Sequence, residues 1–309
     1  MRFVELLERG KPVLAEGSIY ERLRRHPGIR FDDHVAHGGL VYDPHAAAVL
    51  EATHLEYWNV ARRHALPLLA LTDTWRASGK RVAASSLRGR PLNSDNARFL
   101  LELRERHEGP PVFVAGCVGP DGDAYKPVEA LTANDAAELH APQIEELAAA
   151  GVDALLGSTL PAFSEALGMG RSMSATSLPY FLSFVIRSDG TLLDGTSLDE
   201  AFEALDQELD RPPTGYYVNC VHPSVFLAAM EALNNGTRVR GLQANASAMT
   251  PDELDGSDEL QTGDPQHFAD LMLKVHQRHG PLLLGGCCGT DEGHMEALAA
   301  RLAADQRGA

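Results

Sequence analysis

Short apolar, β-prone runs alternate with longer amphipathic segments along almost the whole chain. Apolar runs of four to eight residues, separated by helical patterns, are typical of the strands of α/β proteins. The predicted strands are Pro12–Glu16, Leu68–Thr72, Pro111–Val118, Val152–Leu156, Phe181–Ile186, Tyr216–Cys220, Val239–Gln243 and Pro281–Leu284.

The segments between these runs have helical periodicity, and several carry helix-start signals. Asp43 before Pro44 is an expected N-cap, and Thr132-Ala-Asn-Asp135 and Thr196-Ser-Leu-Asp199 have the spacing of capping boxes. The predicted helices lie near Pro44–His64, Ser94–His107, Ala133–Ala150, Phe163–Leu167, Leu198–Leu209, Pro223–Asn234, Pro265–His279 and Glu292–Ala304. Eight strand–helix units predict a single-domain (β/α)8 TIM barrel over residues 1–309. An open doubly wound sheet is the alternative, because periodicity alone does not close a sheet.

Two predicted loops are long for a barrel. Ser18–Tyr42 follows the first strand, and the acidic stretch Ala244–Asp264 follows the seventh. The second is either a solvated loop or a lid over the barrel mouth, where such loops build active sites.

Composition excludes several classes of partner. The formal net charge is −16, from 43 acidic and 27 basic residues, and a field of that sign repels nucleic acid and anionic membranes. No apolar run is long enough to span a membrane, and the first ten residues lack the apolar stretch of a secretory signal. We therefore expect a cytoplasmic protein and, without a long C-terminal extension, a monomer or a homodimer.

The cysteines carry most of the functional information. Four in so long a chain do not make a disulfide scaffold, and in a reducing compartment they indicate metal binding or catalysis. Cys220 ends the sixth predicted strand, and Cys287 and Cys288 follow the eighth, so all three belong to the same face of a barrel. Three thiolates leave one zinc position open, as in catalytic sites. Cys117 could close the site instead and make the zinc structural.

An open zinc site predicts a reaction. A free thiol has a pKa of about 8.5, and coordination to zinc deprotonates it. Three sulfur ligands leave the metal electron-rich, so a bound substrate thiolate stays nucleophilic toward a methyl group on a sulfonium or quaternary ammonium. The pattern therefore favours zinc-dependent thiol methylation, with zinc activating and orienting the nucleophile.

Two motifs at these cysteines resemble those of the homocysteine S-methyltransferase family, which includes betaine- and S-methylmethionine-dependent enzymes. Gly285-Gly-Cys-Cys-Gly-Thr290 followed by His294 is similar to its C-terminal signature, and Val218-Asn-Cys220 to its upstream ligand motif. Weaker similarities occur at Leu71–Ser78 and at Gly116–Pro120. The resemblance implies a zinc barrel enzyme of methionine biosynthesis that methylates homocysteine, using S-methylmethionine, S-adenosylmethionine or betaine.

The chain departs from the family pattern at two strand ends. The first strand of the family usually ends in Asp-Gly, where this chain has Glu16 and Gly17. The fourth usually ends in Glu-Thr, whose glutamate holds the amino group of homocysteine, and here Ser158 takes that place. Glu16 could hold the ammonium instead, or the acceptor is a different thiol.

Several other residues are candidates for contact with substrate. Trp75 and Tyr20 can offer aromatic faces to a cationic donor or simply pack in the core. Asn219 and Asn245 can orient substrate or bond to backbone at a strand end. The expected substrate-binding residues are Glu16, Gly17, Tyr20, Trp75, Ser158, Asn219 and Asn245.

Three alternatives to homocysteine methylation remain. The chain can be a family member that acts on another small thiol or carbon–sulfur substrate, or a non-catalytic zinc-binding barrel. The third is a redox switch through Cys287 and Cys288. In the leading hypothesis the partners are a small-molecule thiol acceptor and a methyl donor.

Overall fold

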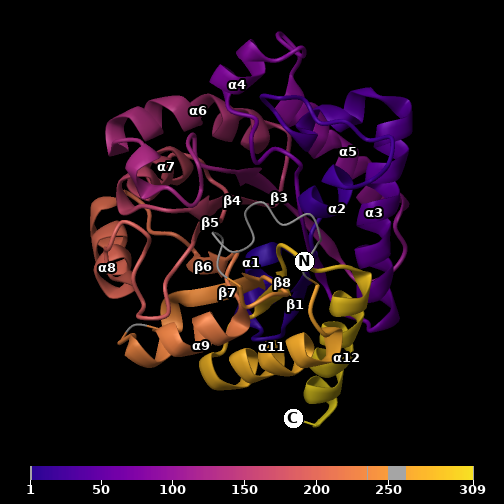
Figure 1. Ribbon diagram of the computed structural model, residues 1–309, viewed down its shortest axis with the longest axis vertical. Helices are drawn as coiled ribbons and strands as arrows, with labels where there is room; N and C mark the ends of the chain where they lie inside the picture. Colours follow the sequence, from indigo (N-terminus) through magenta and orange to yellow (C-terminus); the bar gives the residue numbers. More distant parts are fainter. Residues whose placement is uncertain (1, 235, 250–261, 309) are drawn as a thin grey trace.

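The computed structural model describes residues 2–234, 236–249 and 262–308 and contains one closed parallel barrel (Figure 1). The barrel strands are β1 (Val13–Ala15), β2 (Leu68–Leu71), β3 (Val112–Val118), β4 (Ala154–Leu160), β5 (Tyr180–Phe184), β6 (Gly215–Asn219), β7 (Val239–Ala244) and β8 (Leu283–Gly286). The first and last strands pair in register, with Val13 opposite Leu283. The predicted (β/α)8 barrel is therefore confirmed, and the open sheet is excluded.

The major helices form a ring outside the strands (Figure 1). They are α3 (Pro44–Arg63), α5 (Leu92–Arg106), α6 (Ala133–Ala149), α7 (Phe163–Ser174), α8 (Leu198–Glu208), α9 (Pro223–Ala232), α11 (Pro265–His279) and α12 (Glu292–Gly308). Every predicted strand and helix overlaps an observed one. The short elements α1 (Phe3–Glu8), α2 (Tyr20–Arg24), α4 (Gly79–Ala84), η1 (His37–Tyr42), η2 (Pro127–Glu129) and η3 (Gly236–Arg238) were not predicted.

Helix starts show which local signals were correct. Asp43 accepts hydrogen bonds from the backbone N–H groups of His45 and Ala46 and caps α3 as expected. The capping box of α8 is one residue later than predicted, because the Ser197 hydroxyl accepts from the backbone N–H of Glu200 and the Glu200 carboxylate reaches back. Both pairs have the same spacing in sequence, so spacing alone could not choose between them.

Helix α7 extends further than its predicted end at Leu167. Gly168 disfavours a helix interior and made the pattern look broken. In the structure this glycine lets α7 approach α6, since a Cβ at Gly168 would lie 2.2 Å from the carbonyl oxygen of Ala133. Close packing of the two helices explains why the glycine is tolerated.

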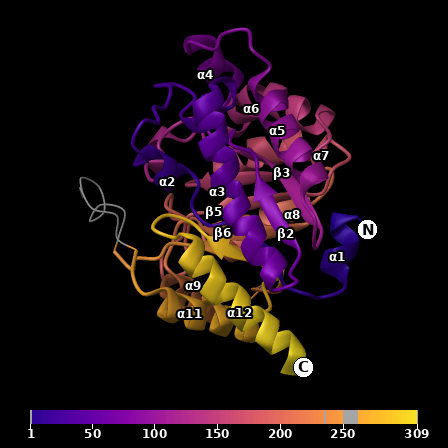
Figure 2. The ribbon, with the colours of Figure 1, turned by 90° about the vertical axis from the view of Figure 1, so that its right-hand side faces the viewer.

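Helix α1 closes the amino-terminal end of the barrel. The ring of Phe3 lies 5.0 Å from that of Phe113 and 6.1 Å from that of Phe181, inside a buried cluster that also holds Tyr217. Figure 2 shows α1 on the opposite side of the barrel from α2. The carboxyl-terminal end, where the strands deliver their last residues, is left for a site.

The first of the two long loops lies at that end. Ser18–Tyr42 contains α2 and η1, so it is more ordered than the expected loop. The predicted lid Ala244–Asp264 lies largely outside the described residues, which stop at 249 and resume at 262. Within the described ranges, no helix is both long and apolar enough to cross a membrane.

Candidate functional site

A cavity of about 490 Å³ lies at the carboxyl-terminal end of the barrel. Parallel strands deliver the residues after them to this single face, so side chains distant in sequence meet here. Of the residues predicted from sequence, the cavity is lined by Glu16, Gly17, Tyr20, Trp75, Ser158, Asn219, Cys220, Cys287 and Cys288.

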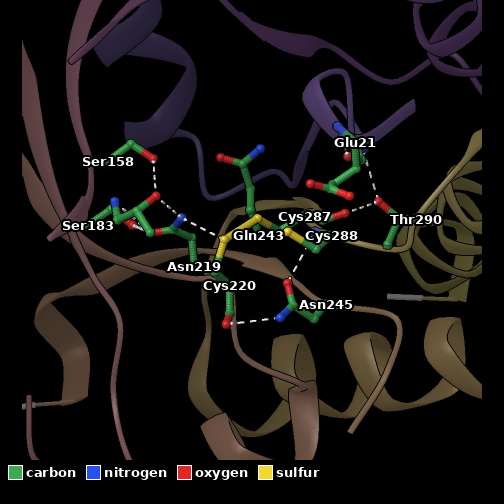
Figure 3. The surroundings of a disulfide bond; sticks show 12 residues. Glu21, Ser158, Ser183, Asn219, Cys220, Gln243, Asn245, Cys287, Cys288 and Thr290 are labelled. Carbon is green, nitrogen blue, oxygen red and sulfur yellow. Dashed lines mark hydrogen bonds between the residues drawn. A yellow bond between two sulfur atoms is a disulfide. The ribbon is translucent and has the colours of Figure 1, made fainter. Parts of the chain in front are cut away.

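The three cysteines lie together on one wall of this cavity (Figure 3). Their sulfur atoms all lie within 4.8 Å of one another. Cys220 and Cys287 are joined as a disulfide, with Cα atoms 5.5 Å apart, and Cys288 is a free thiol. The bonded pair therefore joins two strand ends and is not the adjacent pair that the redox-switch alternative assumed.

The cysteine wall is partly shielded from solvent, with Cys220 buried and Cys287 and Cys288 half-buried, which affects its chemistry. Cys220 is 7% exposed, and burial raises the pKa of the Cys288 thiol to about 12. Desolvation disfavours the thiolate, so a nearby cation is needed to stabilise it. Once reduced, three thiols at this spacing, one buried and two half-buried, fit a soft divalent metal such as zinc.

Glycines allow the loop after β8 to bend around the cluster. A Cβ at Gly286 would lie 2.2 Å from the hydroxyl of Thr290, and Gly289 adopts φ +80°, a region that other residues rarely enter. The Thr290 hydroxyl donates to the carbonyl of Cys287 at 2.7 Å and accepts from the backbone N–H of Ser18 at 3.1 Å. These contacts tie the cysteine loop to the loop after β1.

Asn245 links the two cysteine segments directly. Its side-chain amide donates to the carbonyl of Cys220 at 3.0 Å, and its carbonyl oxygen accepts from the backbone N–H of Cys288 at 3.1 Å (Figure 3). Unlike the other predicted site residues, it is absent from the cavity lining. Its observed role is to position the cysteines, which corresponds to the backbone-bonding alternative.

Asn219 holds the other side of Cys220. Its amide donates to the Thr159 hydroxyl at 2.8 Å and to the Cys220 sulfur at 3.4 Å, and its oxygen accepts from the Ser183 hydroxyl at 2.5 Å. Thr159 and Cys220 both adopt positive φ, +63° and +57°. Such strain in residues other than glycine is maintained only by surrounding contacts and clusters at functional sites.

Glu16 lies in a buried hydrogen-bonded array. Its carboxylate, 2% exposed, accepts from the indole N–H of Trp58 at 2.8 Å, from the backbone N–H of Leu71 at 3.2 Å and from Nδ1 of His54 at 2.7 Å. Nε2 of His54 lies 3.2 Å from Asp73. Despite desolvation, the carboxylates of Glu16 and Asp73 raise the pKa of His54 to about 10, so this side chain is an imidazolium.

The array continues to the cavity wall through Asp73 and His37. Nε2 of His37 lies 3.3 Å from Oδ1 of Asp73, and both residues line the cavity. Burial lowers the pKa of His37, which is therefore neutral, and its buried Nδ1 has no hydrogen-bond partner among the described residues. Sequence reasoning missed His37 and His54. The one available signal was that His54 falls four residues from both Leu50 and Trp58 on the buried face of α3.

An aromatic and cationic wall belongs to the same cavity as the cysteines. The guanidinium of Arg76 lies 4.3 Å from the ring centre of Trp75, and Tyr20 packs against that ring edge-on at 6.0 Å. Arg76 is fixed by the carbonyls of Pro120, Asp121 and Gly122. A cationic donor can therefore approach Trp75 only where Arg76 does not already cover the ring.

Cys117 and Ser158 occupy neighbouring strand ends in the cavity. Cys117 lies outside the group of three sulfurs, so the structural four-cysteine site is not the arrangement found. Burial, followed by the charge of Asp73, raises the pKa of the Cys117 thiol to about 12, which keeps it protonated. Ser158 brings a neutral hydroxyl to this part of the cavity and shares a hydrogen bond of 3.1 Å with Thr159.

Comparison with known proteins identifies the family. The family model of homocysteine S-methyltransferase matches residues 13–302. The chain belongs to the homocysteine S-methyltransferase family. It is an S-methyltransferase, and the non-catalytic alternative is set aside.

Curated relatives and solved structures agree with this membership. Homocysteine S-methyltransferase of Escherichia coli (strain K12) is 28% identical over 278 residues, which cover 82% of this chain and 84% of that protein. Homocysteine S-methyltransferase YbgG of Bacillus subtilis (strain 168) is 24% identical over 258 residues, covering 75% and 78%. The oxidized and metallated crystal structures of the homocysteine methyltransferase MmuM from Escherichia coli each share the fold, with TM-score 0.76, 23% identity and coverage of 96% and 98%.

Proposed function

We propose that this enzyme transfers a methyl group from an onium-type donor to the thiol of homocysteine, giving methionine, with zinc held by Cys220, Cys287 and Cys288. The observation that carries the proposal is the convergence of three sulfurs within 4.8 Å on the wall of a substrate-sized cavity. Family membership supports homocysteine as the acceptor. The candidate donors are S-methylmethionine, S-adenosylmethionine and betaine. The proposal also treats residues 1–309 as one barrel domain.

The donor set fits zinc once the disulfide is reduced. Three thiolates with no fourth protein sulfur in the group match a catalytic zinc site with one open position. When bound there, zinc supplies the Lewis acidity that turns a substrate thiol into a thiolate near neutral pH. The metallated form of MmuM is a structural neighbour with the same fold.

The chain's own residues position the reactants. The substrate sulfur forms a bond to the methyl carbon, the bond from that carbon to the donor's sulfur or nitrogen breaks with its electron pair, and the thiol proton leaves to solvent. In-line attack requires that the attacking sulfur and the methyl carbon are held close together and aligned. Such positioning increases the rate by several orders of magnitude. Asn219 and Asn245 fix the cysteine wall, while Tyr20 and Trp75 form the aromatic part of the cavity against which a cationic methyl group can lie.

The direct test supplies reduced, zinc-loaded enzyme with homocysteine and each of the three donors. We expect methionine with at least one donor, and zinc-edge X-ray absorption should show three sulfur neighbours rising to four when homocysteine is added. The diverged-substrate alternative would be favoured if homocysteine is not methylated with any of the three donors but another small thiol is.

Replacing Asn245 should weaken the metal site without destroying it. Asn245→Ala removes the two hydrogen bonds that link the Cys220 and Cys288 segments. Groups that orient metal ligands typically contribute about 10- to 100-fold in metal affinity. We expect a loss of that size in zinc affinity, measured by chelator competition, with activity recovering at saturating zinc. Activity that stays low when zinc is saturating would instead assign Asn245 a role in contacting substrate.

A further inference from the structure

The buried array beside the cavity carries an unbalanced negative charge. Glu16 and Asp73 are each about 97% buried or more, and the His54 imidazolium between them balances only one of the two carboxylates. His37 adds no charge, because burial keeps it neutral. A neutral His54 would leave two uncompensated charges instead of one. Buried charge without a partner is costly, so this arrangement is suited to a bound cation.

Asp73 is the member of the array that can accept further hydrogen bonds from a ligand. His54 approaches Glu16 more closely than Asp73, at 2.7 Å against 3.2 Å, and Glu16 also accepts from Trp58 and Leu71. Asp73 contacts His54 and His37 at 3.2 and 3.3 Å and lines the cavity. A carboxylate has about four acceptor positions, so lone pairs of Asp73 remain for a ligand.

The other carboxylates of the cavity already have cationic partners. Glu21 pairs with Arg24 at 3.2 Å and also with Arg25, and Asp123 pairs with Lys126 at 3.2 Å. Among the described lining carboxylates that have no lysine or arginine partner, Asp73 has fewer hydrogen-bonding contacts than Glu16, two against three.

A second observation points to a ligand with hydrogen-bond donors. Nδ1 of His37 is a buried acceptor without a partner among the described residues, and His37, 5% exposed, lines the same cavity as Asp73. Leaving such an acceptor unsatisfied is costly, so a ligand that brings a hydrogen-bond donor to this part of the cavity is favoured, and the Asp73 carboxylate attracts a cationic donor. The field of Asp73 also reaches Cys117, which contacts Ser158, so the carboxylate acts on the part of the cavity where Ser158 offers only a hydroxyl.

We propose that Asp73, together with His37, forms the subsite that binds the amino group of the thiol acceptor. The proposal rests on the proposed function and adds the group that selects an α-amino thiol over a simple thiol. Asp73 lies at the end of β2 and Cys220 at the end of β6, so the subsite and the cysteines lie on different parts of the same cavity lining.

The test compares homocysteine with 4-mercaptobutyrate, which has the same thiol and carboxylate but no amino group. With S-methylmethionine as donor, we expect wild-type kcat/KM to favour homocysteine by about 10- to 100-fold, the size of one charge-assisted hydrogen bond. Asp73→Asn should remove this preference. It should lower kcat/KM for homocysteine, while kcat/KM for 4-mercaptobutyrate should stay within about threefold of the wild-type value. His37→Phe should lower the preference less. Equal slowing of both thiols by Asp73→Asn would overturn the subsite.

Asp123→Asn is the matched control, because it removes a carboxylate from the same cavity that already has a lysine partner. It should leave the preference unchanged, and a loss equal to that of Asp73→Asn would assign the effect to the general field of the cavity. Calorimetric measurement of the binding of both thiols to the wild-type enzyme distinguishes the amino-group subsite from the proposed methyl transfer. Equal binding overturns the subsite, even if neither thiol is methylated. Preferential binding of homocysteine without turnover supports the subsite and rejects only the proposed reaction.

Discussion

Cys220→Ser is expected to abolish zinc binding and to lower kcat/KM by at least about 1000-fold, on the order of 4 kcal/mol of transition-state stabilisation. Serine is nearly the same size but offers a neutral hydroxyl in place of a thiolate, and two cysteines alone do not hold catalytic zinc at neutral pH. Zinc content after dialysis and steady-state kinetics under reducing conditions measure the two effects.

The control for this change is Cys117→Ser. Cys117 lies in the same cavity and is equally buried, but it is outside the group of three sulfurs and its thiol stays protonated. It should keep one zinc per chain and most of the activity. The assignment of ligands is wrong if Cys117→Ser loses zinc, or if Cys220→Ser retains both zinc and turnover.

The cysteine site was predictable because two rules of barrel architecture suffice to find it. Cys220 and Cys287 come directly after strands, and the carboxyl ends of barrel strands share one face. No long-range information is needed beyond the strand order. The family resemblance predicted Glu16, Ser158 and Asn219 as substrate residues, and all three line the cavity, although the resemblance does not say which atoms these side chains contact.

The buried array was not predictable, for a physical reason. His54 comes from the buried face of α3, and its partners Glu16 and Asp73 lie 38 and 19 residues away in sequence. A histidine on an apolar helix face gives no signal for its partner, and an acidic strand end can face solvent, a loop or the core. Only packing α3 against β1 and β2 brings the three together.

Predicted helix ends were wrong for a related reason. Gly168 lowers helix propensity locally and made α7 appear to end early, while its contact with Ala133 depends on the distance between α6 and α7. The capping box at Ser197 was displaced by one residue because both possible pairs have correct spacing. Local pattern thus identified the elements, and tertiary contacts decided their ends.

The second large effect concerns stability. His54→Leu should lower the free energy of unfolding by about 3–5 kcal/mol at pH 7, because it leaves Glu16 and Asp73 as buried carboxylates with no counter-charge. The pKa of His54 is raised from 6.5 to about 10 in the fold. A raised pKa means that the stabilisation is complete below pH 6.5 and is lost as pH rises toward 10. The difference between wild type and variant should therefore shrink across that window.

Denaturant unfolding at a series of pH values measures this difference, and His64→Leu is its control. His64 also contacts a carboxylate, that of Glu296 at 2.6 Å, but the two side chains are 20% and 41% exposed. Exposed pairs contribute little, so this change should cost no more than about 1 kcal/mol. A His54→Leu penalty as small as that of His64→Leu, or one that stays constant from pH 6.5 to 10, would show that the array is not held together by the imidazolium. Because Asp73 belongs to that array, the same result would weaken the case for a cation subsite beside it.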